Sequence, residues 1–333
     1  NVVRPRLIRG VRQPPVILPI APAATHTRGM DGRQRPNRNA GVDMNRSIAS
    51  RALHGATRWG ALFASLVLCA PGLQAQEKVL RAVMHADVRV IDPFWTTQTI
   101  ANIHGMLVYD TLFGNDADMK PQPQMVDTYT ISEDRKSYSF TLREGLKFHD
   151  GSPVTTKDVI ASLRRWGARD GVGQRLLRYV TKMEAVNDKT FRMELSEPYG
   201  MVLESLGKTN SSVAIIMREQ EALTDPQQQV KEAIGSGPFK FAKEQWVPGS
   251  KTVYLKNPDY KPRPGNEPAS SFAGSKFAGV DRIELVWIAD SQTAMSALIN
   301  GEIDFYEAPN TDFYPILEKA RGVKLMASGK LDS

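Results

Sequence analysis

Side chains that could do chemistry lie closest together in the segment Leu142–Pro153, which reads LREGLKFHDGSP. Its adjacent residues His149 and Asp150 are of the types found in general-base pairs. Such chemistry also needs an orienting group and a nucleophile, and neither stands nearby in the sequence. Glycine and aspartate are turn-forming residues, so a turn explains the segment without catalysis. We therefore expect no catalytic residue and no enzymatic activity.

Metal and phosphate sites are also disfavoured. The chain has 5 histidines, and no two of them stand at the His-x-x-x-His spacing of a metal site. Gly235, Ser236 and Gly237 have the glycine content of a phosphate-binding loop. However, Pro238 lacks an N–H donor, and a strand-like run follows where a phosphate loop requires a helix. We expect no metal and no cofactor, and interpret these three residues as a tight backbone turn.

The elements around the His149 segment have clear patterns. Residues 137–142 alternate polar and apolar side chains, as a half-buried strand does. Thr155 and Asp158 stand at the spacing of a helix capping box. The helix that they begin places Val159, Ile160, Leu163 and Trp166 on one face. We expect Arg164 and Arg165 to lie on its solvated face.

The rest of the chain after residue 76 alternates short strand-like and helix-like segments without an internal repeat. Strands are expected near residues 79–84, 127–131, 183–186, 190–195, 239–244, 252–255, 281–288, 304–307 and 323–326. Helices are expected at residues 100–113, 201–206, 292–300 and 313–320, and a glycine-bearing loop at 169–173. The pattern predicts an α/β fold with mixed sheets and flanking helices.

The amino-terminal 43 residues differ from the rest in composition. They hold eight arginines, six prolines, two acidic residues and no lysine. Two interpretations stay open: a disordered basic extension, or upstream sequence translated in error. An arm that binds nucleic acid is disfavoured because no aromatic residues are interleaved with the arginines. Residues 1–75 carry a net charge of +9 and the whole chain +7, so the remainder is close to neutral and nucleic acid is not an expected partner.

Residues 44–75 have the layout of a secretory signal peptide. Three arginines precede an apolar run at residues 59–70, and Ala75 supplies a small residue before a cleavage site. The apolar run is short for a membrane span, although an uncleaved anchor is the alternative. Cys69, the only cysteine, lies inside this run and would be removed with it. Cleavage would release the mature chain outside the inner membrane.

Several motifs resemble, in order, those of the family 5 extracellular solute-binding proteins, which are the peptide, dipeptide and nickel receptors of bacterial ABC importers. The resemblance runs from about Val79 to the last residue, and five motifs in register make it specific. They are Ile91-Asp92-Pro93, the run from Lys147 to Val159, Gly235-Ser236-Gly237-Pro238-Phe239, Asn257-Pro258-Asp259-Tyr260, and the run from Ala297 to Asp304.

This resemblance implies a lobe of a periplasmic-binding-protein fold of type II, similar to cluster C. In the family the chain builds one lobe, crosses to a second and returns. The resemblance therefore implies a first lobe at residues 76–310 and the start of a second at 311–333, with most of the second lobe missing from this sequence.

The resemblance also implies a function. We expect a monomeric periplasmic receptor that captures a peptide or similar small solute between two lobes and delivers it to the transmembrane subunits of an ABC permease. Three segments are expected to approach the ligand. They are Phe94, Trp95 and Thr96; Asn210, Ser211 and Ser212; and Gly235, Ser236 and Gly237. A secreted peptide hydrolase and a chaperone-like peptide-binding module are the alternatives.

Overall fold

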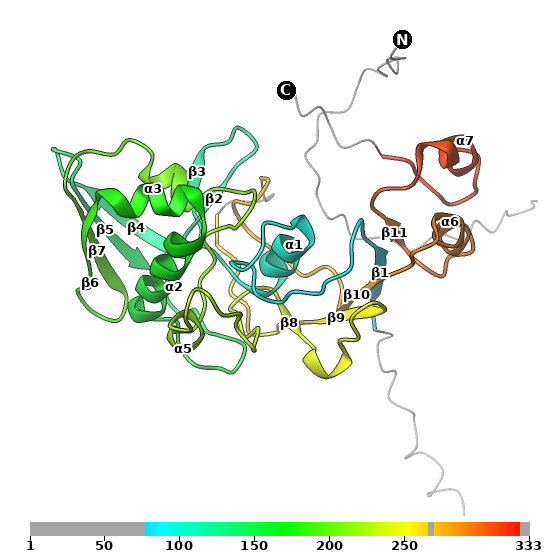
Figure 1. Cartoon of the computed structure of the whole chain (residues 1–333), viewed down its shortest axis with the longest axis horizontal. Coiled ribbons are helices and arrows are strands. Elements are labelled where there is room, and N and C mark those ends of the chain that lie inside the picture. Colours follow the sequence, from blue (N-terminus) through cyan, green and yellow to red (C-terminus); the bar gives the residue numbers. More distant parts are fainter. Residues whose placement is uncertain (1–76, 266–269, 327–333) are drawn as a thin grey trace, which may run out of the picture. The chain divides into compact units, whose positions relative to one another are not determined.

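The computed structural model describes residues 77–265 and 270–326, which all belong to one compact unit. These residues form two larger sheets, a short hairpin and flanking helices (Figure 1). The mixed α/β architecture expected from the sequence is therefore present. The signal-peptide interpretation and both interpretations of the first 43 residues concern positions outside the described residues.

The first sheet has five strands in the order β11-β1-β10-β9-β8. Strand β1 pairs in parallel with β10 on one side and with β11 on the other, whereas β10, β9 and β8 are antiparallel neighbours. The strands are β1 (Val79–Val83), β8 (Phe239–Phe241), β9 (Lys251–Lys256), β10 (Arg282–Val286) and β11 (Phe305–Tyr306). Three parallel strands thus end at the same edge of this sheet.

The second sheet has four antiparallel strands in the order β4-β5-β7-β6. They are β4 (Val126–Ile131), β5 (Ser137–Leu142), β6 (Val180–Ala185) and β7 (Thr190–Leu195). Strand β5 alternates half-buried and buried residues along its whole length, as its sequence predicts. A separate hairpin joins β2 (Phe113–Asn115) to β3 (Pro121–Pro123).

Helix α2 (Thr156–Arg169) packs against the four-stranded sheet and continues into α3 (Gly171–Tyr179) (Figure 1). The Asp158 carboxylate accepts the backbone N–H of Thr155 at 2.8 Å, as the predicted cap requires. The expected loop at residues 169–173 is wrong. Asp170 caps α3 by accepting the N–H groups of Val172 and Gly173 at 2.9 and 3.1 Å.

Helices α1, α4 and α7 are shorter than the sequence pattern predicts, α6 lies within one residue of its expected bounds, and α5 was not predicted. Helix α1 ends at Val108, because the Val108 carbonyl accepts the Gly237 N–H at 2.9 Å and the chain becomes extended at Tyr109. Residues 323–326 form no strand. The helices are α1 (Thr99–Val108), α4 (Val202–Leu206), α5 (Glu219–Ala222), α6 (Ser291–Ile299) and α7 (Tyr314–Leu317), with 3-10 turns η1 (Lys243–Gln245) and η2 (Thr311–Phe313).

One hydrophobic core includes side chains from both larger sheets. Phe140 and Phe191 of the four-stranded sheet stack with their ring centroids 5.0 Å apart, and Phe113 meets Phe140 edge-on. The same core contains Tyr254 and Leu285 of the five-stranded sheet. A smaller cluster covers β1 from α6. The shared core fixes the loops between the two sheets.

Candidate functional site

The loop that follows β1 is the first place to look for a ligand site. In open α/β sheets, ligands bind beyond the carboxyl ends of parallel strands. Strand β1 lies between two parallel neighbours, and the chain leaves it at Val83 and reaches α1 only at Thr99. The described residues between them form no helix or strand, so their conformation depends on side-chain anchors.

A buried ion pair anchors this loop. Asp92 is fully buried, and its Oδ2 lies 2.7 Å from Nη2 of Arg165, whose side chain is 1% exposed. The Asp92 carboxylate also accepts the N–H groups of Phe94 and Val230, each at 3.0 Å. Arg165 further donates to three carbonyls, those of Thr224, Asp225 and Gln228. These hydrogen bonds offset much of the cost of burying the two charges, although the Arg165 Nε has no partner within the described residues.

This geometry corrects the prediction that Arg165 lies on a solvated helix face; only Arg164 does. Helical periodicity places Arg165 on the same face as the buried Ser162 and Ala161, three and four positions earlier, and its charge is tolerated there because of Asp92, 73 positions earlier. The same pair explains the Ile91-Asp92-Pro93 motif as an internal anchor.

The three residues that follow the anchor have different environments. Phe94, which was expected to approach the ligand, is 2% exposed and belongs to the core. Trp95 and Thr96 are half-buried. The Arg169 guanidinium lies over the Trp95 ring, with its carbon 4.8 Å from the ring centroid. Trp95 and Thr96 thus keep part of their surface exposed, whereas Phe94 does not.

The Asn210–Ser212 segment also meets α2. The Ser212 carbonyl accepts the indole N–H of Trp166 at 2.8 Å, and Ser212 is buried. Ser211 has a φ of 54°, a left-handed conformation uncommon for a residue other than glycine, and Asn210 is exposed. The carboxyl half of α2 thus contacts two of the three predicted segments, through Arg169 on one and Trp166 on the other, while Arg165 binds Asp92 just before the first segment.

The Gly235–Gly237 turn is buried and held by backbone contacts. A Cβ atom on Gly235 would lie 2.0 Å from the Val108 carbonyl oxygen, so no larger residue fits. Asn257 donates to the Gly237 carbonyl at 3.0 Å, and β8 follows directly. The turn interpretation is confirmed, and these residues support the fold without presenting free N–H groups at a surface.

His149 holds this turn against the segment that follows strand β5. Its Nδ1 accepts the Gly235 N–H at 3.3 Å, and its Nε2 donates to the Gly237 carbonyl at 3.1 Å. Burial lowers the pKa of His149 to about 4, against the opposing effect of its bond to Gly237. Asp150 contacts Ser152 and Arg218 instead of His149. Both ring nitrogens are occupied, so His149 is not placed as a general base.

Two residues at the strand edge escaped the sequence reasoning. His85 follows β1 and Glu307 follows β11, and the His85 Nδ1 lies 2.7 Å from the Glu307 carboxylate. The His85 N–H donates to the same oxygen at 2.9 Å. Both side chains are about one-third exposed, at 34% and 29%. The available signal was that His85 follows one predicted strand and Glu307 ends another, and the two residues add polar groups to the edge where the loop after β1 begins.

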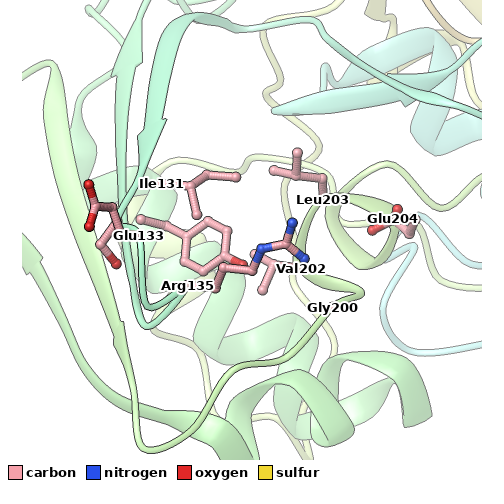
Figure 2. Close-up of a pocket in the computed structure, with 9 residues that line it drawn as sticks. Ile131, Glu133, Arg135, Gly200, Val202, Leu203 and Glu204 are labelled. Carbon is pink, nitrogen blue, oxygen red and sulfur yellow. The ribbon is translucent and has the colours of Figure 1, made fainter.

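A shallow depression lies elsewhere, between the β4–β5 hairpin and α4. Ile131 and Arg135 of the hairpin face Val202 and Leu203 of the helix across it (Figure 2). None of the predicted ligand residues lines this depression. Within residues 77–265 and 270–326, no group of three or more metal-binding side chains comes together. No helix in that part of the chain is long and apolar enough to span a bilayer.

Comparison with known proteins assigns the chain to a family. The model for bacterial extracellular solute-binding proteins, family 5 Middle, matches residues 120–331. The chain therefore belongs to this family, and the resemblance seen in its motifs is confirmed.

Individual relatives are transport receptors. A probable peptide ABC transporter periplasmic-binding protein of Sinorhizobium fredii is 39% identical over 277 residues, covering 82% of this chain and 51% of the relative. A glutathione-binding protein of Escherichia coli is 27% identical over 84% of this chain and 51% of its own length. The chain thus spans about half the length of the curated relatives that it matches.

Solved structures agree on the fold. The periplasmic binding protein DppA of Helicobacter pylori, in complex with the peptide STSA, is 26% identical with a TM-score of 0.59, over 73% of this chain and 49% of that one. The oligopeptide-binding protein AppA of Bacillus subtilis, in complex with a nonapeptide, has a TM-score of 0.58 at 20% identity, over 74% and 47% of the two chains. The expected periplasmic-binding-protein fold is therefore confirmed.

Proposed function

We propose that this protein is the substrate-binding component of an ABC importer and that it captures a peptide or similar small solute. Membership of the solute-binding family and the named relatives support this proposal. The observation that carries it is the loop after β1, which is anchored by Asp92 and Arg165 and leaves Trp95 and Thr96 half-exposed. Half-exposed aromatic and hydroxyl groups on a fixed loop suit recognition of a small organic ligand.

In this proposal the ligand is bound and released unchanged. An open form takes the solute, closure around it shifts a pre-existing equilibrium, and the closed form meets the transmembrane subunits of a permease. Residues 76–310 supply one side of the site, and residues 311–333 begin the other. We further propose a monomer that acts in the periplasm after removal of residues 44–75, as the periplasmic relatives support.

The ligand-contacting residues of this proposal are Trp95, Thr96, Asn210 and Ser211, joined by His85 and Glu307 at the strand edge. Ser212 and the Gly235–Gly237 turn act by holding backbone in place. The peptide hydrolase alternative is not favoured, because both ring nitrogens of His149 are bound to the backbone.

Binding assays on the purified protein test the proposal. We expect the peptide STSA or glutathione to bind by isothermal titration, and mass spectrometry to recover each ligand intact. Cleavage of the peptide that His149→Ala abolishes would support the hydrolase. Binding of unrelated unfolded peptides regardless of their length would support the chaperone-like module. Absence of binding to any peptide would overturn the proposal.

A further inference from the structure

Two arginines on α2 reach the ligand loop from the same side. Arg165 and Arg169 stand four positions apart, so their side chains lie on one face of the helix. Arg165 is buried and binds the Asp92 anchor, whereas Arg169 is half-buried and reaches the residues just beyond it. The loop follows a strand of the five-stranded sheet, but α2 packs against the four-stranded sheet. A helix that packs against the four-stranded sheet therefore holds a loop that follows a strand of the five-stranded sheet.

Arg169 contacts Trp95 in two ways. Its Nη2 donates to the Trp95 carbonyl at 3.1 Å, and its Nε lies 3.5 Å from the Phe94 carbonyl. The same guanidinium covers the Trp95 ring at 4.8 Å. Gln227 Oε1 accepts a hydrogen bond from Arg169 Nη1 at 3.4 Å and so helps to fix the guanidinium. One planar group therefore fixes both the backbone and the ring of Trp95, which a flexible ammonium could not do.

Fixing the ring matters because a free indole rotates about two bonds. A side chain that must be immobilised on binding lowers affinity, whereas one already held in its bound orientation does not. Trp95 is half-exposed, so part of its ring stays open while Arg169 covers the rest. Stacking on an exposed indole suits planar groups such as peptide bonds and aromatic side chains.

We propose that Arg169 is a positioning residue for ligand recognition: it holds the Trp95 ring as a preformed platform for a planar group of the ligand. The proposal rests on the peptide-binding function inferred above. Arg165 secures the loop through Asp92, and Arg169 sets the orientation of the side chain that the loop presents.

The test compares Arg169→Met, Arg169→Lys and Trp95→Phe, with Arg164→Met as the matched control. Arg164 is exposed on the same helix and makes no hydrogen bond or ion pair to the described part of the chain. The probe is the peptide STSA, measured by isothermal titration. We expect Arg169→Met to weaken binding about tenfold and Arg169→Lys to restore it only partly. Arg164→Met should bind as the wild type does.

A double-mutant cycle separates positioning from general stability. In the Trp95→Phe background, Arg169→Met should weaken binding by less than half as much as in the wild type, because a smaller phenyl ring replaces the indole that Arg169 covers. Equal losses in the two backgrounds, or unchanged binding by Arg169→Met, would overturn the proposal.

A second readout needs no ligand, so it stands even if the wild type binds no peptide and the proposed function fails. The Trp95 indole resonance, assigned by its loss in Trp95→Phe, should move and broaden in Arg169→Met and stay in place in Arg164→Met. An unmoved, sharp Trp95 resonance in Arg169→Met would refute the positioning role.

Discussion

At the residue scale, the groups that resemble catalytic or phosphate-binding chemistry are used inside the fold. His149 bonds to both ends of the Gly235–Gly237 turn, and Asp92 binds Arg165. Neither leaves a free polar atom aimed at solvent for a reaction. Their role is to hold loops and turns at fixed positions.

Gly235→Ala should unfold the protein at lower denaturant concentration. Its new Cβ would lie 2.0 Å from the Val108 carbonyl oxygen, and backbone cannot move aside easily. We expect a loss of at least about 2 kcal/mol in the free energy of unfolding, measured by urea denaturation. Gly279→Ala is the control, because no atom lies within 4 Å of its added Cβ. Equal stabilities of the two variants would contradict the packing described for the turn.

His104 should make stability depend on pH. It is fully buried, its Nδ1 lies 2.9 Å from the Tyr254 hydroxyl, and burial lowers its pKa from 6.5 to about 4. The unfolded chain takes up a proton on this ring below about pH 6.5, and the folded chain does so only near pH 4. The stabilisation is therefore present above pH 6.5 and is lost as the pH falls toward 4, by about 2 kcal/mol at pH 5.

Urea denaturation between pH 5 and 7.5 checks this expectation. His104→Gln should reduce the slope and leave the part that His149 contributes, because burial also lowers the pKa of His149 to about 4. Tyr254→Phe keeps the His104 ring and removes only the hydroxyl that it contacts, so the slope should persist in that variant. A slope in His104→Gln as steep as in the wild type would show that other groups cause it.

At the element scale, α2 packs against the four-stranded sheet and holds the loop that follows β1. Its cap and apolar face are visible in the sequence, since both depend on residues a few positions apart. The burial of Arg165 is not, because its cause is Asp92, which is distant in the chain and near only after folding. The existence of α3 was also not visible in the sequence, because its glycines indicated a loop. Gly167 of α2 and Gly173 of α3 instead allow the two helices to touch.

Removing one partner of the Asp92–Arg165 pair should be strongly destabilising. Arg165→Met leaves a buried carboxylate without its cation, which costs about 3–5 kcal/mol. The double variant Asp92→Asn with Arg165→Met removes both charges and should lose less than the sum of the two single variants. Chemical denaturation of all four proteins measures the coupling. Strict additivity would mean that the pair contributes no interaction of its own.

At the scale of the whole molecule, the chain spans about half the length of its relatives. Apolar side chains near the end of the described chain are exposed, including Phe305 at 47% and Ile316 at 50%. The strands of the two larger sheets and the fold class could be predicted from the sequence, because alternation and motif order carry them, whereas the β2–β3 hairpin was missed and the expected strand at 323–326 is absent. The environment of the loop after β1 could be predicted only in part, because the burial of Phe94 and the contact between His85 and Glu307 depend on tertiary structure.

A solute enclosed on all sides gains more than one held on a single face. We therefore expect STSA to bind at least about 100-fold more tightly when the chain is extended by the remaining length of the Sinorhizobium fredii relative. Isothermal titration of the two proteins makes the comparison, with circular dichroism to verify that both are folded. Equal affinities would mean that the 333 residues already form a complete site.

The most direct test of the account is a nuclear magnetic resonance titration of this protein, labelled with ¹⁵N, with the peptide STSA. The account predicts saturable shifts of the Trp95 indole and of the backbone at Thr96 and Thr97 in the loop after β1. Shifts confined to the depression beside Arg135, or no shift at millimolar peptide, would contradict it.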